Sequence, residues 1–291
     1  MKKKIISIVM IVAIVAVCLC AFAACGKKDK VEAINIDLSS EQYAFAVRKT
    51  DTALLNSVNQ FFAEKMTEVN AILNKYLNAT ADELAAMRTG ITYQTSGDVN
   101  NTDSVLVVAT NLEFSPFEYI NGSEAVGADM EIAKLLAEYL HQTLVVVNME
   151  FDAVVTSVQT LTQYDIGIAG LTITDERKES VNFSTPYFGT TQVIVVKEGD
   201  TTFADCTTAA QVEEKLASLT GNAAKCGGQS GTTSQFYVEG SDDLGFNGFT
   251  NLTFAPYSSA ALAIQDMING NIAFVLVDKA VANSLVKSIN G

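Results

Sequence analysis

Hydrophobic positions follow two different periods along this 291-residue chain, and their alternation predicts an α/β architecture. Apolar residues at three- and four-residue steps cover 54–77, which predicts one amphipathic helix or two helices with a break near Lys65. From residue 105 onward, short apolar runs typical of buried strands alternate with helical segments, the rhythm of a parallel sheet covered by helices. The predicted strands are 33–36, 43–47, 105–109, 144–147, 166–169, 192–196 and 273–277, and the predicted helices after 54–77 are 127–140, 153–161, 211–219, 261–268 and 278–290.

The first 25 residues have the composition of an export signal. Three lysines form a basic start, the stretch 5–24 carries no charge, and small residues precede Cys25. This pattern resembles a bacterial lipoprotein signal, which implies a signal peptide at 1–24 and a lipidated Cys25 followed by a tether at 25–30. An uncleaved transmembrane helix is the alternative, because the apolar run is long enough to span a bilayer. Both interpretations put the rest of the chain outside the cytoplasm.

Charge and composition exclude several classes of partner. Without residues 1–24, the remaining 16 basic and 33 acidic residues give a net charge of −17. Such an acidic surface repels DNA and RNA, so we expect no nucleic-acid partner. One histidine in the whole chain makes a Cys/His zinc site untenable, and we expect no metal and no cofactor.

Two cysteines remain beyond the signal segment. Cys206 and Cys226 are an even pair in an oxidising compartment, which is compatible with a disulfide. Two thiols alone do not define a disulfide framework, and the sequence does not give their separation. The pairing of Cys206 with Cys226 is therefore one of two open alternatives, the other being two free thiols.

A loop motif at 169–177 carries the clearest candidate chemistry. The Arg177 guanidinium can hold a planar α-carboxylate through two parallel charge-assisted hydrogen bonds. Thr172 adds a hydroxyl, and Gly170 lets the backbone approach a ligand closely because it has no Cβ. Taken alone, Arg177 would be read as a solvated charge beside acidic neighbours. Together with the segment 181–187 that follows it, the motif looks very like the binding loop of solute-binding proteins from polar amino-acid ABC importers.

The resemblance extends to further loops and implies ligand-binding roles for them. Phe114 and Phe151 match two aromatic walls of the family, which would sandwich the aliphatic stem of a ligand. Core packing is the alternative for both rings. Thr232 and Thr233 lie in a glycine-containing loop that opens a helix, where hydroxyls and free N–H groups favour a carboxylate. An ordinary helix cap is the alternative for that loop.

The resemblance also implies how the ligand's two charges are paired. Asp278 ends the last predicted strand, where the family's acid pairs with the ligand's α-ammonium, so Arg177 and Asp278 would together recognise a zwitterion. Asp278 could also cap the final helix. Asn111 stands where the family's binders of cationic amino acids carry an acid, which favours an uncharged polar ligand such as glutamine. Glu113 or Glu118 could supply an acid instead, and cystine and basic amino acids stay open.

The matching segments stand in an unusual order. Residues 36–77 look like the end of such a binding protein, and residues 104–290 look like its beginning and middle, so the chain resembles a circularly permuted member. The resemblance implies a type II periplasmic-binding-protein fold with two lobes, each a mixed, mostly parallel sheet flanked by helices. The expected division is 38–190 as lobe 1, which contains 78–103 as the permutation linker, and 191–291 plus 31–37 as lobe 2.

These features predict a substrate-binding lipoprotein of an ABC importer. Two hinged lobes would close on a polar L-amino acid and deliver it to a permease in the membrane to which Cys25 anchors the protein. We do not expect an enzyme, although dehydratases share this lobe architecture. His141, the only histidine, lies away from the motif loops, so no Ser/His/Asp or Cys/His set can be built. A sensory ligand-binding subunit is a further alternative.

Overall fold

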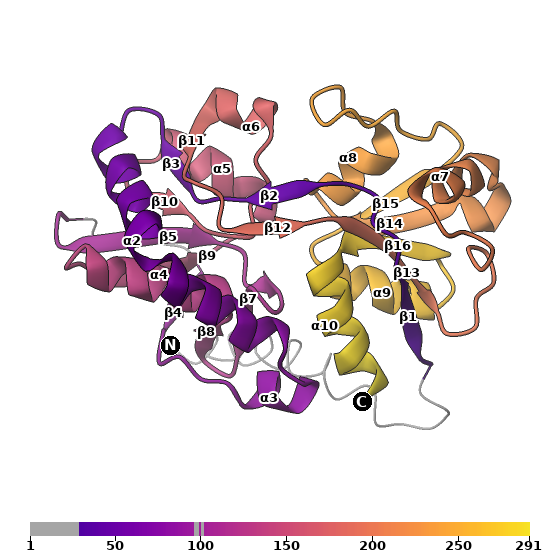
Figure 1. Ribbon diagram of the computed structural model, residues 1–291, viewed down its shortest axis with the longest axis horizontal. Helices are drawn as coiled ribbons and strands as arrows, with labels where there is room; N and C mark the ends of the chain where they lie inside the picture. Colours follow the sequence, from indigo (N-terminus) through magenta and orange to yellow (C-terminus); the bar gives the residue numbers. More distant parts are fainter. Residues whose placement is uncertain (1–28, 96–98, 100–101) are drawn as a thin grey trace, which may run out of the picture.

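Two sheets form two lobes that lie side by side and are joined by a pair of crossover strands (Figure 1). The computed structural model describes residues 29–95, 99 and 102–291, so the predicted signal peptide and the lipidated Cys25 lie outside the described residues. Within the described ranges, no helix is long and apolar enough to cross a membrane.

The first lobe is built on a six-stranded, mixed sheet. Its strands, in spatial order, are β11 (Val181–Phe183), β3 (Ala46–Arg48), β10 (Ile166–Gly167), β5 (Val105–Thr110), β9 (Thr143–Asn148) and β4 (Tyr93–Gln94). Strands β10, β5, β9 and β4 pair in parallel, and β3 is antiparallel to β10 and β11. The lobe also contains a small sheet of β6 (Glu113–Phe114), β7 (Glu118–Asn121) and β8 (Glu124–Val126) and the helices α2 (Thr52–Leu77), α3 (Ala81–Ala86), α4 (Ala128–Tyr139), α5 (Phe151–Thr160) and α6 (Asp175–Ser180).

Helix α2 is continuous, so the alternative of a break near Lys65 is wrong. Asp51 caps its first turn by accepting a hydrogen bond from Leu54 N at 2.9 Å. The apolar stripe predicted from the sequence is the buried face, which packs against α4. Its fully or nearly buried residues are Val58, Phe61, Phe62, Val69, Leu73 and Tyr76.

The second lobe is built on a five-stranded, mixed sheet. Its strands, in spatial order, are β1 (Val31–Ile34), β13 (Gln192–Lys197), β16 (Phe274–Asp278), β14 (Lys225–Gln229) and β15 (Thr253–Tyr257). The helices of this lobe are α7 (Ala209–Ser218), the short 3₁₀ helix η2 (Gly221–Ala224), α8 (Thr233–Glu239), α9 (Ala260–Ile268) and α10 (Lys279–Asn290). Strand β1 pairs antiparallel with β13, so a segment near the start of the described chain completes a sheet formed mainly by the last hundred residues.

The lobes are connected by two antiparallel crossover strands, β2 (Glu41–Tyr43) and β12 (Phe188–Thr190). The prediction of one strand over 43–47 is wrong in detail, because the segment divides its hydrogen bonds between two sheets. Its first part pairs with β12 in the crossover, and its second part becomes β3 of the first lobe. Figure 1 shows both crossover strands running from one lobe to the other.

Part of the segment predicted as a linker belongs to the first lobe. Thr80 and Glu83 form a capping box at the start of α3, and β4 adds an edge strand beside β9. The side chain of Glu124 accepts hydrogen bonds from Thr89 N and Gly90 N, both at 2.8 Å. Residues 79–95 are therefore packed against the lobe rather than merely spanning a gap.

Candidate functional site

The two lobes face each other in a closed arrangement, with side chains of one bonded to the other. Gln229 Nε2 of the second lobe donates to Asn111 Oδ1 of the first at 2.7 Å, and Ser230 Oγ donates to Asp152 Oδ2 at 3.0 Å. The carboxylate of Asp243 accepts hydrogen bonds from the first two backbone N–H groups of α6, each at 2.9 Å. These contacts join the two lobes, and the predicted ligand-binding residue Asn111 takes part in one of them.

Arg177 bridges the lobes from α6. Thr174 caps that helix by accepting from Arg177 N at 3.0 Å, which orients the first turn. Nη1 of Arg177 donates to the Thr172 carbonyl at 2.8 Å, and Nη2 donates to the Gly231 carbonyl of the second lobe at 3.0 Å. The guanidinium also lies 5.4 Å from the ring centroid of Phe151, a cation–π contact. Arg177, Phe151 and Gly231 line one cavity of about 220 Å³.

Gly170 occupies a position that a larger residue would not fit. Its φ is +53°, and a Cβ there would lie 2.9 Å from Cε1 of Phe114. Gly170 N donates to Asp129 Oδ2 at 2.9 Å, so a buried acid that sequence reasoning missed orients the loop. Phe114 is 7% exposed and its ring packs against Phe117 and Tyr43, so most of this ring belongs to the core.

Asp278 is a buried acid held by the crossover. It is 3% exposed and accepts a hydrogen bond from the Tyr43 hydroxyl at 2.6 Å. Burial, and then the negative charge of Glu41, raise the pKa of Asp278 to about 7. Asp278 occupies the N-cap position of α10, as the helix-cap alternative predicted, but its side chain makes no capping hydrogen bond to that helix.

Another buried acid, Glu41, accepts hydrogen bonds from the hydroxyls of two of the predicted ligand-binding threonines. Thr172 Oγ1 donates to Glu41 Oε2 at 2.9 Å from the first lobe, and Thr233 Oγ1 donates to the same atom at 2.7 Å from the second. Thr232 Oγ1 instead donates to the Gln229 carbonyl at 2.7 Å. Sequence reasoning missed Glu41, because its partners Thr172 and Thr233 lie more than a hundred positions away in the chain.

The two cysteines are free thiols, so the disulfide alternative is wrong. Cys226 Sγ lies on β14 and contacts the Thr253 carbonyl, whereas Cys206 Sγ contacts the Gln211 carbonyl. No group of three or more His, Cys, Asp or Glu side chains suited to a metal ion occurs in the part of the chain that the structure describes.

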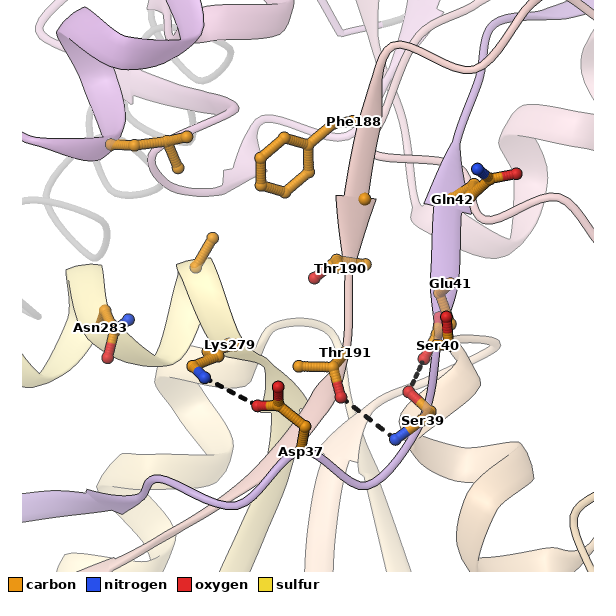
Figure 2. Close-up of a pocket in the computed structure, with 13 residues that line it drawn as sticks. Asp37, Ser39, Ser40, Glu41, Gln42, Phe188, Thr190, Thr191, Lys279 and Asn283 are labelled. Atoms are coloured by element: carbon orange, nitrogen blue, oxygen red, sulfur yellow. Dashed lines mark hydrogen bonds and ion pairs between the residues drawn. The ribbon is translucent and has the colours of Figure 1, made fainter.

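A second cavity, of about 550 Å³, lies beside the crossover strands (Figure 2). It is lined by β2, β12 and the start of α10, and the ion pair of Lys279 with Asp37 lies in its wall. Of the residues discussed above only Glu41 reaches it, and none of the predicted ligand-binding residues does. This cavity is therefore separate from the predicted ligand-binding residues.

Comparison with known proteins identifies relatives of this fold and sequence. The family model of bacterial extracellular solute-binding proteins, family 3, matches residues 106–288. ABC transporter arginine-binding protein 1 of Escherichia coli (strain K12) is 32% identical over 178 residues, which are 60% of this chain and 63% of that protein. The chain thus spans less than two thirds of this relative's length.

Two solved structures also resemble part of the chain. The arginine-bound form of truncated ArgBP from T. maritima is 30% identical with a TM-score of 0.53, covering 63% of this chain and 77% of that one. The ancestral amino acid-binding protein AncCDT-1, described as a precursor of cyclohexadienyl dehydratase, is 28% identical with a TM-score of 0.54, covering 63% and 74%.

Proposed function

Because the chain belongs to the bacterial extracellular solute-binding proteins, family 3, we propose that it captures a polar L-amino acid between its two lobes. The observation that carries the proposal is a pair of opposite charges contributed by opposite lobes. Arg177 of the first lobe reaches the Gly231 carbonyl, and Asp278 of the second lobe accepts the Tyr43 hydroxyl. A ligand carboxylate on Arg177 and a ligand ammonium on Asp278 would pair both charges of a zwitterion.

The side chain of the ligand should donate hydrogen bonds. Gln229 is 3% exposed, and its Oε1 has no hydrogen-bond partner among the described residues. A buried acceptor without a donor is costly, so an N–H group from the ligand would stabilise the complex. Glutamine, favoured by Asn111, has such a group, and so has arginine, for which relatives are named. Cystine is a third candidate.

The closed complex would then be delivered to an ABC permease in the membrane. Closure about β2 and β12 presents both lobes together, which an open form does not. We propose that Cys25 is lipidated and anchors the protein to the outer face of the cell membrane. Incorporation of labelled fatty acid that persists in a Cys25→Ala variant would contradict the anchor.

Catalysis is the less favoured alternative. The similar solved structure AncCDT-1 is described as an amino acid-binding protein that preceded a dehydratase. Its similarity to this chain therefore favours ligand binding over catalysis as the function. Turnover of a candidate substrate by the purified protein would reverse this order.

We propose further that the order of elements is circularly permuted relative to the family. The family match starts at 106, yet β1, β2, β3 and α2 precede it and complete both lobes. Val31 N donates to Asn290 Oδ1 at 3.0 Å, and Asn290 Nδ2 donates to the Val31 carbonyl at 2.8 Å. The end of α10 and the start of β1 are thus close enough to be joined by a short loop. A chain with the family's order of elements, in which α10 would be followed by β1, would require such a loop.

A thermal-shift screen tests the proposed function. Residues 27–291 would be melted with each L-amino acid, with cystine, and with the matching D-amino acids. A ligand at 100 times its Kd adds about 2.7 kcal/mol to the free energy of unfolding, which corresponds to roughly 5–10 °C for a protein of this size. Stabilisation by one or a few L-amino acids is expected. A cooperative melt that no amino acid shifts would refute the function.

A further inference from the structure

A second buried carboxylate lies beside the amino-acid site, and the proposed function gives it no partner on the ligand. Glu41 is 5% exposed and lies on the crossover strand β2. Side chains at alternate positions of a strand point to the same face, so Glu41 and Tyr43 share the face that carries the hydrogen bond to Asp278. Figure 2 shows Glu41 at the start of this strand and its hydrogen bond from Ser39, which lies in the segment before the strand.

Four donors hold the Glu41 carboxylate in place. Oε2 accepts from the hydroxyls of Thr172 and Thr233, at 2.9 and 2.7 Å. Oε1 accepts from Ser39 Oγ at 2.6 Å and from Gln192 Nε2 at 3.1 Å. All the acceptor positions of the carboxylate are occupied by the protein. Glu41 therefore acts on a ligand as a stationary negative charge and not as a group that swings onto it.

The charges around the site do not balance for a neutral amino acid. Among the candidate-site side chains that the structure describes, half-buried Arg177 carries the only positive charge, against the buried acids Glu41, Asp278 and Asp129. In the ligand-free site the charge of Glu41 is the main one that interacts favourably with Arg177. When the carboxylate of a neutral zwitterion pairs with Arg177 and its ammonium pairs with Asp278, the charge of Glu41 is left without a cation of its own. An unpaired charge inside a protein is costly because the interior solvates it poorly.

We propose that Glu41 is a specificity-determining residue, whose charge makes the site prefer an amino acid with a cationic side chain over a neutral one of the same shape. The inference rests on the proposed function, since it assumes that the ligand pairs with Arg177 and Asp278. The cationic side chain supplies the missing positive charge, and Gln229 Oε1 accepts one of its N–H groups. Asn111 argues for an uncharged ligand, but Glu41 supplies an acid from a different segment.

The test compares L-arginine with L-citrulline by isothermal titration calorimetry. Citrulline has the same length and shape as arginine, but its urea group is neutral. We expect the wild type to bind arginine at least about tenfold more tightly than citrulline. In the Glu41→Gln variant, the ratio of the two affinities should fall by about tenfold. Glu41→Asp keeps the charge and should keep the ratio. Asp37→Asn removes an exposed acid of the same segment, which pairs with Lys279 at 2.7 Å, and should also keep it.

Each other outcome is decisive. Equal affinity of the wild type for arginine and citrulline, or binding of neutral amino acids alone, overturns the proposal without any variant. Weaker binding of both ligands by Glu41→Gln at an unchanged ratio assigns Glu41 a structural role and also overturns it. Glu41→Ala, which leaves room for water beside the two hydroxyls, replaces Glu41→Gln if that variant does not fold. Failure of the wild type to bind any amino acid refutes the proposed function itself.

Discussion

Replacing Arg177 by alanine removes the group that should hold the ligand's α-carboxylate. The guanidinium is already held by the carbonyls of Thr172 and Gly231, at 2.8 and 3.0 Å, and its other N–H groups remain to bind a carboxylate. Each charge-assisted hydrogen bond contributes about 1.5–3 kcal/mol. Loss of two such bonds therefore costs about 3–6 kcal/mol, which raises Kd by about 10²- to 10⁴-fold.

Calorimetry with the ligand found in the thermal-shift screen would measure this change. Lys178→Ala is the matched control, because it removes the same charge from the next residue. Lys178 is exposed and pairs only at the surface, with Asp175 at 2.8 Å, so its loss should change Kd by less than about threefold. The reasoning is refuted if Arg177→Ala binds as tightly as Lys178→Ala.

Three further predictions follow from the buried acid, the thiols and the order of the chain. Asp278→Asn should weaken binding but raise the ligand-free melting temperature near neutral pH. Burial, and then the charge of Glu41, raise the pKa of Asp278 from 3.8 to about 7. The wild type therefore loses stability as the pH rises between these two values, and the variant does not. Melting temperatures of the two proteins that change in parallel with pH would contradict this. In a protein of residues 27–291, half-buried Cys206 should react with a thiol reagent. Burial raises the pKa of Cys226 to about 12 and should keep that thiol unreactive. Two reactive thiols, or none, would contradict this prediction. A chain reordered to run 79–291 and then 29–78 should fold and bind with wild-type affinity because Val31 and Asn290 are already bonded, and its failure to fold would argue against a permuted order.

Periodicity was sufficient to predict the elements that have one clearly buried face. Helix α2 and strands β5, β9 and β13 all fall within a residue or two of the expected segments because their apolar residues recur at a regular step. Strand β14 was missed because Gly227 and Gly228 interrupt its pattern. A Cβ at either glycine would come within 3.0 Å of a neighbouring strand, so these residues permit close packing that no hydrophobic signal reports. The edge strand β15 was hidden by Pro256.

The candidate site was predictable only where one loop carries several of its residues. The motif around Arg177 was visible because Gly170 and Thr172 stand beside it in the sequence. Glu41 and Gln229 were not, since each joins the site through a contact with a residue more than a hundred positions away. Long-range contacts of this kind depend on how the lobes close, which local spacing does not encode.

A crystal structure of the complex with the amino acid identified by the screen tests the central claim most directly. We predict closed lobes, with the ligand's α-carboxylate within hydrogen-bonding distance of the Arg177 guanidinium and its α-ammonium on the Asp278 carboxylate. A ligand bound elsewhere, for example in the cavity of about 550 Å³ beside the crossover, would contradict the claim. So would a ligand in the cleft that contacts neither Arg177 nor Asp278.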